Sequence, residues 1–345
     1  MKRELTWGGR PRRNSLGSGA GFTILELLVA VTIALMLSGL MLAVVTGTLN
    51  QWQRTQDGFS ISAQAKLALD MVERDLQAAV FRRDGGSWFA VDVINTPTSL
   101  TVHGWLASGS IKPATAESQR LVPETTDGTA PAICDARFGL SGAWLRFVTT
   151  NVESGGSLPI AVSYQVARRP VSGAITATNP ADVRYTLFRA AVSTENTFAS
   201  GNDVMASAYG SSASNPAASR NPATLANPNT TDALATNVVD FGIWFYERDS
   251  SGGLRRIFPL DNNATSYAAH DSSTPPVAPR FPQLADVMVR ILTENGAVKL
   301  AKIEHGSGHL TRPAGYANDR EWWWAVVEEN SRVYTRRIEV KGASL

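Results

Sequence analysis

The sequence predicts an α+β protein: a long N-terminal helix, transmembrane at its start and amphipathic further on, followed by a head domain with an antiparallel β-sheet. Three observations predict this. An apolar run of 24 residues extends from Phe22 to Val45. Apolar residues with helical spacing continue to Ala79, and no proline interrupts residues 50–83. Beyond Gly86, short β-rich segments alternate with clusters of Gly, Pro, Ser and Asn.

The apolar run has the length of a membrane span. About 20 apolar residues in a helix cross the roughly 30 Å hydrocarbon core of a bilayer. Glu26 is the only ionisable residue in the run, and a carboxylate inside such a span is costly enough to indicate a function. One acidic residue, Glu4, and five basic residues precede the run. The basic residues are Lys2, Arg3, Arg10, Arg12 and Arg13. This excess of positive charge predicts a cytoplasmic N-terminus.

Gly21, Phe22 and Glu26, placed behind a basic leader, resemble the class III signal of the type IV pilin superfamily. The resemblance implies that a prepilin peptidase cuts after Gly21 and that the new amine of Phe22 is methylated. Glu26 then becomes the fifth residue of the mature chain and takes part in assembly. Two alternatives stay open. A secretory signal would have a shorter apolar region followed by a small-residue cleavage site, and a plain signal anchor would leave Glu26 unexplained.

The helix is expected to continue beyond the bilayer and to end at the turn Asp84-Gly85-Gly86. Gly58 is a candidate kink, and Asp70 and Arg74 are four apart, a favourable pairing on a helix. The apolar residues that mark one helical face are Ala65, Leu69, Val72, Leu76 and Ala79. That face is expected to pack against the head.

Ten segments after Gly86 are candidate strands. They are Trp88–Ile94, Ser99–Trp105, Trp144–Thr149, Ile160–Ala167, Arg184–Ala190, Val238–Glu247, Asp286–Leu292, Lys299–Glu304, Trp322–Val327 and Arg332–Val340. Several alternate between apolar and polar residues, which is typical of an antiparallel sheet with one solvated face. Residues 107–135 and 193–236 look loop-like, and the second, rich in small uncharged residues, is expected to be a flexible insertion.

The resemblance extends past the signal. Residues 68–80 are similar to the helix end of the J-type minor pseudopilins of type II secretion and of related minor type IV pilins. Residues 237–249 resemble their central strand, and residues 282–292 and 334–338 resemble their C-terminal strands. The chain departs from the pattern in its length and in residues 193–236, so the subunit type stays open.

Composition restricts the function further. The full chain has a formal charge of +2, but residues 1–21 carry +4, so the remainder is near −2. No basic patch suited to nucleic acid emerges. Cys134 is the only cysteine, so no intramolecular disulfide is possible, and it is expected to be a small buried apolar residue.

No catalytic motif, metal site or cofactor site is expected, and the sequence therefore does not predict an enzyme. The four histidines are His103, His270, His305 and His309. Residues 304–309 hold two histidines and Glu304, but their glycines predict a flexible loop and not the helix that fixes zinc ligands. Residues 261–263 (Asp-Asn-Asn) lack the alternating carboxylates of a calcium loop and are typical of a turn. Residues 322–324, three tryptophans on an expected strand, would point to both faces and are expected to pack in the core.

We therefore expect four parts: a leader peptide at 1–21, a transmembrane helix at 22–45, its amphipathic continuation at 46–84 and a β-rich periplasmic head at 85–345. The resemblance implies a minor pilin-like subunit of the bacterial inner membrane, assembled by its helix near the tip of a pseudopilus or pilus. Its partners would be the prepilin peptidase, sibling subunits, the inner-membrane assembly platform and membrane lipid. The alternative is a membrane-anchored periplasmic binding module that does not polymerise.

The first testable expectation is cleavage between Gly21 and Phe22 with methylation of the new amine. Gly21→Val should block cleavage, because a branched side chain would not fit where the peptidase accepts glycine. Intact-mass measurement of the membrane fraction checks both points. A wild-type chain that keeps residues 1–21 in cells with an active prepilin peptidase would contradict the pilin interpretation.

Overall fold

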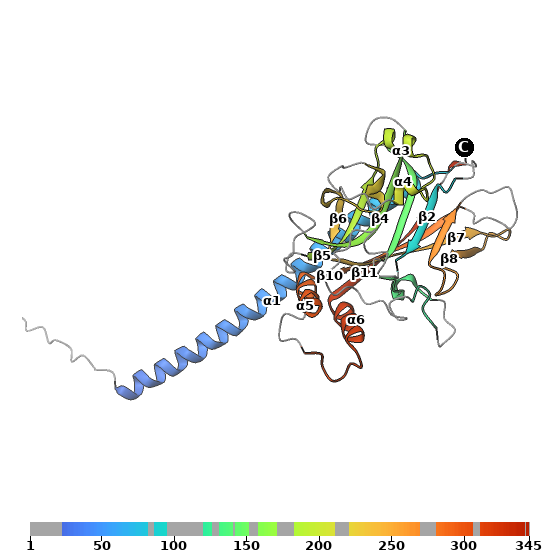
Figure 1. The fold of residues 1–345 in the computed structure, drawn as a ribbon. Helices are drawn as coiled ribbons and strands as arrows, with labels where there is room; N and C mark the ends of the chain where they lie inside the picture. The colour runs from blue at the N-terminus through green and yellow to red at the C-terminus, as the bar shows by residue number, and fades with distance from the viewer. Residues whose placement is uncertain are drawn as a thin grey trace, which may run out of the picture. The chain divides into compact units, whose positions relative to one another are not determined.

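The computed structural model describes residues 23–81, 86–94, 120–125, 131–140, 142–151, 158–170, 183–210, 221–269, 281–305, 311–341 and 343–344. Helix α1 (Ile24–Gln77) has 54 residues and is followed by antiparallel β-sheets, so the predicted α+β class is confirmed (Figure 1). The chain forms two compact units, residues up to Gln56 and residues from Asp57 on, and their boundary falls inside α1.

In the first unit, α1 is predominantly apolar from Ile24 to Leu49, and these residues are exposed. These 26 residues would span about 39 Å at 1.5 Å per residue. Among the described residues this is the one helical segment long and apolar enough to cross a membrane. Its threonine hydroxyls donate to backbone carbonyls four residues earlier, as Thr32 does to Leu28 O at 2.8 Å. This satisfies polar groups that lipid could not, and the segment is compatible with a single-pass membrane anchor.

In the second unit, the later turns of α1 are buried on one side. The apolar face predicted from the sequence is confirmed, because Ala65, Leu69, Val72, Leu76 and Ala79 are all buried. The helix is continuous through Gly58 and ends at Gln77, earlier than the predicted turn at 84–86. Strand β1 (Val80–Phe81) follows at once, and the carbonyl of Ala78 already accepts the Thr150 N–H at 3.1 Å. Pairing with the sheet thus ends the helix.

The strands of the head form two antiparallel sheets, in agreement with the predicted antiparallel pairing. The six-stranded sheet has the order β6 (Ala233–Thr236), β5 (Val183–Ala191), β4 (Leu158–Pro170), β3 (Ala143–Asn151), β2 (Phe89–Val93) and β9 (Ser266–Ala269). The four-stranded sheet has the order β11 (Ser331–Glu339), β10 (Leu284–Leu292), β7 (Val238–Arg248) and β8 (Leu254–Phe258). A short parallel pair joins β1 to β12 (Ala343–Ser344). The candidate strand 99–105 lies outside the described residues.

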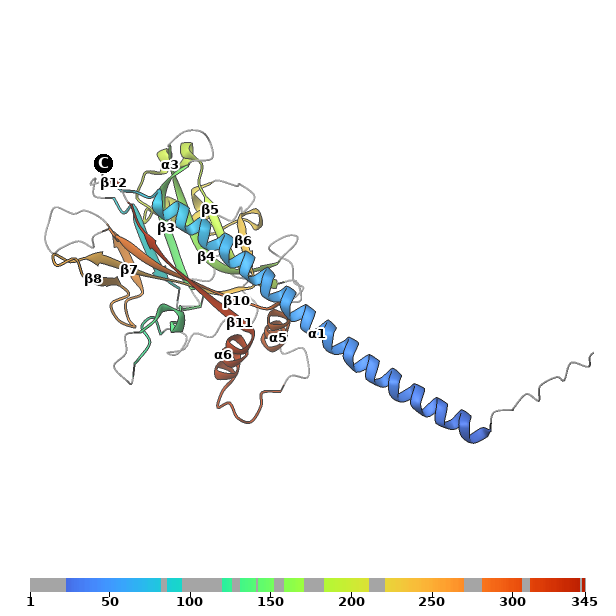
Figure 2. The same ribbon diagram turned by 180° about the vertical axis from the view of Figure 1, so that it is seen from behind.

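The two sheets and the later turns of α1 share one hydrophobic core. Phe89 of β2 lies between the sheets, with its ring centroid 5.3 Å from that of Phe147 and 5.0 Å from that of Phe245. Figure 2 shows the later turns of α1 lying across β3, β4 and β5. The helix therefore helps to enclose the core, which explains its apolar face.

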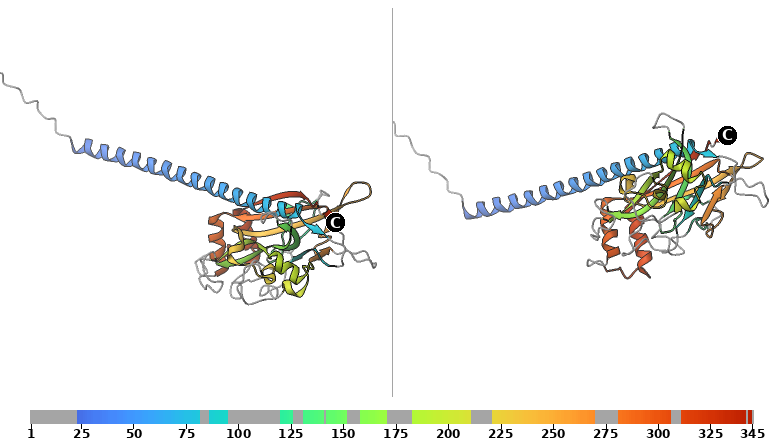
Figure 3. Two further views of the ribbon diagram at one scale, coloured as in Figure 1. Left: turned by 90° about the horizontal axis from the view of Figure 1, so that it is seen from above. Right: turned by 45° about the horizontal axis from the view of Figure 1, so that its top comes forward.

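Two segments predicted as strands are helices. Residues 299–304 lie in α5 (Glu294–His305), and residues 322–327 lie in α6 (Asp319–Asn330). Figure 3 shows the two helices side by side. The side chain of Asn318 caps α6 by accepting the N–H groups of Arg320 and Glu321 at 3.1 and 3.0 Å, a local signal that outweighs the β-propensity of Trp and Val.

The three consecutive tryptophans therefore lie on a helix. Trp323 and Trp324 belong to the core, so the expected packing role is confirmed for these two, although the expected strand is wrong. Their ring centroids are 5.0 Å apart in an edge-to-face arrangement, a geometry that aromatic pairs favour.

Residues 193–210 and 221–236 are not the unstructured insertion that their composition predicts. They form α3 (Thr194–Ser200), α4 (Ser207–Gly210), η3 (Pro222–Leu225), η4 (Thr230–Asp232) and β6, and the helical turns cover the outer face of β4 (Figure 1). The carbonyl of Leu225 accepts hydrogen bonds from Trp144 Nε1, Ser163 Oγ and Gln165 Nε2 at 2.8–2.9 Å. Both faces of β4 are consequently buried, and the expected solvated face is wrong for this strand.

This covering layer makes a stability prediction. Leu225 is 0% exposed, so Leu225→Ala should lower the free energy of unfolding by about 2–5 kcal/mol. The matched control, Leu260→Ala, removes a side chain that is 67% exposed and should change stability by no more than about 0.5 kcal/mol. Chemical denaturation of the detergent-solubilised chain, followed by tryptophan fluorescence, measures both. Equal, small effects would mean that residues 221–236 do not pack on the sheet in solution.

Candidate functional site: the start of α1 and its attachment to the sheets

Of the site residues predicted from the sequence, Gly21 and Phe22 lie outside the described residues, and Glu26 lies in the first turn of α1. Glu26 and Thr23 cap this helix reciprocally. Glu26 Oε2 accepts from the backbone N–H of Thr23 at 3.0 Å and lies 3.2 Å from its hydroxyl, while Thr23 Oγ1 accepts the Glu26 N–H at 3.2 Å. This is a capping box, and the Thr-x-x-Glu pattern in the sequence could have revealed it.

The capping box shows what Glu26 does within a single chain. It satisfies N–H groups at the helix start and places negative charge where the helix dipole favours it. Both contacts of the Glu26 carboxylate use Oε2, and a carboxylate has room for further donors. Glu26 can therefore cap its own helix and still receive a second, external partner.

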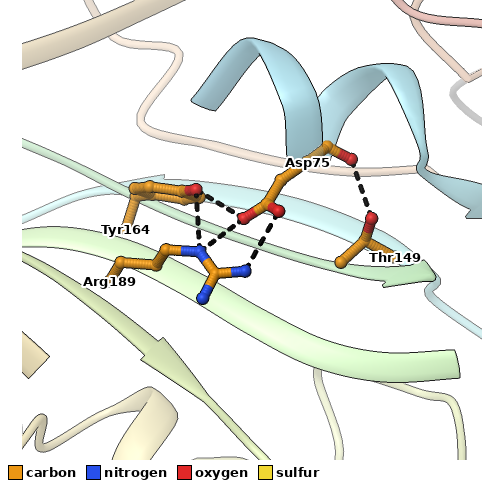
Figure 4. A network of polar contacts seen from close by, with 4 residues as sticks. All are labelled: Asp75, Thr149, Tyr164 and Arg189. Carbon is orange, nitrogen blue, oxygen red and sulfur yellow. Dashed lines mark hydrogen bonds and ion pairs between the residues drawn. The ribbon is translucent and has the colours of Figure 1, made fainter. Parts of the chain in front are cut away.

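The last turn of α1 carries a buried carboxylate that sequence reasoning missed. Asp75 is 4% exposed and receives Arg189 of β5 through two hydrogen bonds, Nε to Oδ2 at 2.7 Å and Nη2 to Oδ1 at 3.0 Å. The hydroxyl of Tyr164, on β4, donates to Oδ2 at 2.5 Å. The hydroxyl of Thr149, on β3, donates to the Asp75 carbonyl at 2.9 Å. Figure 4 shows how these three strands converge on one residue of the helix.

The electrostatics of this network follow from its burial. Burial, and then the charge of Asp75, raise the pKa of Tyr164 well above its ordinary value, so the phenol stays protonated and acts as a donor. Burial has the largest single effect on Arg189 and lowers its pKa, but the hydrogen bonds to Asp75 and Tyr164 and the charges of the same two groups together outweigh it, and the pKa rises. A two-pronged arginine–carboxylate pair of this kind fixes geometry as well as charge. The network therefore fixes the position of α1 on the six-stranded sheet.

Further polar contacts join α1 to the four-stranded sheet. Asp70, which the sequence pairs with Arg74, forms an ion pair with Arg336 of β11 at 2.5 Å, and Glu73 meets the same Nη1 atom at 2.7 Å. Ser62 Oγ lies 2.8 Å from the hydroxyl of Tyr334. The helix is thus attached to both sheets, with its most buried polar contact at Asp75.

Glu304, considered above as a metal ligand, is occupied by another buried network. Its side chain is 2% exposed and receives Arg168 Nη2 at 3.1 Å, Trp323 Nε1 at 3.0 Å and the hydroxyl of Tyr185. Burial raises the pKa of this carboxyl, and the charge of Arg168 opposes the rise. The network joins α5 and α6 to β4 and β5, and it leaves Glu304 in a structural role.

Only some of the remaining candidate metal ligands lie within the described residues. His103, His270 and His309 and the side chain of His305 lie outside what the structure describes. Within the described residues no group of three His, Cys, Asp or Glu side chains could hold a metal ion. Asp261 forms the expected turn, its Oδ1 accepting the N–H groups of Asn263 and Ala264 at 2.7 and 3.0 Å.

Cys134 lies in η1 (Ile133–Asp135) and is partly exposed, so the expectation that it is fully buried is wrong. Partial burial, and then the charge of Asp135, raise the pKa of its thiol. A thiol with a raised pKa is a poor nucleophile at neutral pH.

Comparison of the chain with models of known protein families, with characterised proteins and with solved structures gives no match. The residues themselves therefore define the class: an α+β protein whose N-terminal helix is apolar enough to anchor it in a membrane.

The Asp75 network predicts a large difference between two carboxylates of one helix. Asp75→Asn leaves the largely buried cation of Arg189 uncompensated and should cost about 3–5 kcal/mol of stability. Asp70→Asn removes one partner from a partly exposed ion pair and should cost at most about 1 kcal/mol. Denaturant unfolding of the full chain in detergent measures both, and equal costs would show that Asp75 does not fix the helix.

Proposed function

We propose that this chain is a minor pilin-like subunit that is cut by a prepilin peptidase and assembled through its N-terminal helix into a type II secretion pseudopilus or a type IV pilus. The observation that carries the proposal is the combination of Gly21, Phe22 and Glu26 with the helix that follows them. That helix begins with an exposed and predominantly apolar segment of 26 residues and ends in turns packed against two sheets. A helix that only filled the core of the head would not need its exposed apolar half.

In the proposed mechanism the bilayer first covers the apolar half of α1. The basic leader stays in the cytoplasm. The head would then lie in the periplasm, on the other side of the bacterial inner membrane. After cleavage, helices of neighbouring subunits replace lipid around residues 24–49, and the assembly platform adds subunits to the growing fibre. The firm attachment of α1 at Asp75 supports this mechanism, because the head must follow the helix out of the membrane.

Glu26 would act at the moment when helices bundle. A carboxylate that loses access to water costs several kcal/mol unless it is paired. The amine of Phe22 on a neighbouring subunit is the natural partner, since it is positive and lies at the same level of the bundle in the matching register. The capping box retains Glu26 near the helix start, where such an amine can reach it. Pairing would thereby favour the correct register over its alternatives.

The second candidate function is a membrane-anchored periplasmic binding module that does not polymerise. The observation that favours it is a polar cleft on the head, about 440 Å³ in volume and lined by three arginines, Arg120, Arg137 and Arg290. A fibre subunit could carry such a cleft as well. The two functions are therefore distinguished by the role of Glu26 and not by the cleft.

Variants of the capping box test the assembly role. Glu26→Gln removes the charge but keeps a side chain that can complete a capping box, whereas Thr23→Ala removes the cap and keeps the charge. We expect both variants to be inserted and cleaved normally, and only Glu26→Gln to be largely lost from the complex of pilin-like subunits. Quantitative pull-down from crosslinked membranes measures the recovery of sibling subunits.

The opposite pattern would contradict the proposal. If Glu26→Gln recovers its siblings as the wild type does and Thr23→Ala does not, Glu26 serves only to cap its helix. The stabilisation that a helix cap provides, about 1 kcal/mol, would then be the whole contribution of Glu26.

A further inference from the structure

The outer face of the four-stranded sheet carries a cleft that the proposed function does not use. The cleft lies between β10 and β11, the segment around η1, and α6, and its volume is about 440 Å³. This is within the range of about 300–1,000 Å³ that is usual for ligand pockets. Arg290 of β10, Arg120 before η1 and Arg137 after it all line the cleft.

The strand register brings Arg290 to this face. On β10, Val289 pairs with Phe241 of β7 and belongs to the core, so Arg290 points to the opposite face of the sheet. Next along this face, the ring of Phe138 covers Gly242 so closely that a Cβ atom there would lie 1.9 Å from it. The segment around η1 therefore seals the sheet beside Arg290 and leaves the cleft above it.

Arg290 is buried without a full set of partners. It is 7% exposed, and its Nη2 donates to the carbonyl of Cys134 at 3.3 Å. Its Nε has no hydrogen-bond partner among the residues that the structure describes. Asp240 lies opposite Arg290 in the register, and its Oδ2 accepts the Phe138 N–H at 3.1 Å. A buried donor that is left unpaired is costly, which points to a ligand that completes it.

The same face shows what such an arginine binds. Arg337 presents its Nε and Nη2 side by side to the carboxylate of Asp286, both at 2.7 Å. Arg290 has the same edge, with Nε unpaired and Nη2 held only by a long contact to a carbonyl. A carboxylate is therefore the group that matches this guanidinium in charge and in geometry.

The rest of the lining favours a carboxylate carried by a peptide. Arg137 is paired with Glu328 of α6 and stacks on Trp324, 4.6 Å from the ring centroid. Glu124 and Asp135 also line the cleft, and their negative charge would repel a compact multivalent anion such as phosphate. A peptide that carries one carboxylate on an otherwise neutral, hydrogen-bonding chain avoids most of this repulsion. It also fills far more of the cleft than phosphate would.

We propose that this cleft binds a peptide segment of a partner protein through an Asp or Glu side chain, which Arg290 receives in the cleft and Arg120 attracts at the mouth. The proposal does not rest on the proposed function, because a fibre subunit and a binding module could each present this cleft.

The test uses the full chain in detergent and its tryptophan fluorescence, to which Trp324 contributes from its position against Arg137, a residue of the lining. N-acetyl-Ala-Glu-Ala-amide should give a saturable change, and the Gln analogue should not. Arg290→Gln and the exposed-site variant Arg120→Gln should each weaken binding about tenfold. Arg312→Gln removes an arginine that does not line the cleft and should bind as the wild type does. Arg120→Gln keeps the test decisive if Arg290→Gln fails to fold.

Three results would overturn the proposal. One is the absence of a saturable change with the Glu peptide. Another is an equal loss of binding in Arg312→Gln, which would indicate attraction by net charge alone. The third is binding of acetate or inorganic phosphate as tightly as the peptide, which would assign the cleft to a free anion.

Discussion

The arrangement of the head depends on the hydrogen bonds that Asp75 receives. Asp75 lies on the last turn of α1, and strands β3, β4 and β5 all donate hydrogen bonds to this residue. A buried ion pair adds little to net stability compared with an apolar contact, but it specifies one position. The apolar face of α1 could slide along the sheets by a turn with modest loss, whereas Asp75 has one place where Arg189 and Tyr164 meet it.

This constraint lets one helix work in two environments. Up to Leu49 the helix is predominantly apolar and suits lipid or other helices, and from Ile61 on the buried residues suit a protein core. The capping box at Thr23 and Glu26 closes one end of α1, and the Asp75 network closes the other. The capping box and the most buried polar contact of the helix thus lie at its two ends, where assembly and attachment would require them.

The sequence predicted features that depend on local periodicity and missed those that depend on distant partners. The apolar run, the buried face of α1 and most strands follow from spacing alone. Asp75 was overlooked because Tyr164 and Arg189 are 89 and 114 residues away, yet it falls three residues after Val72 and four before Ala79, on the buried face. A charge at such a position is a signal, and Arg290 gives the same signal inside an apolar strand. Residues 221–236 were misjudged because small uncharged side chains suit a loop and also suit close packing on a sheet.

The proposal that α1 assembles with helices of its own kind is tested most directly inside the membrane. A photo-crosslinking amino acid at Leu35, in the middle of the exposed apolar half, samples whatever surrounds the helix there; the same group at Leu260, on the head, serves as a control. The proposal predicts adducts at position 35 with chains that carry the same Gly-Phe and Glu signal, and their loss in Glu26→Gln. Adducts with lipid alone, in cells that express the sibling subunits, would contradict it.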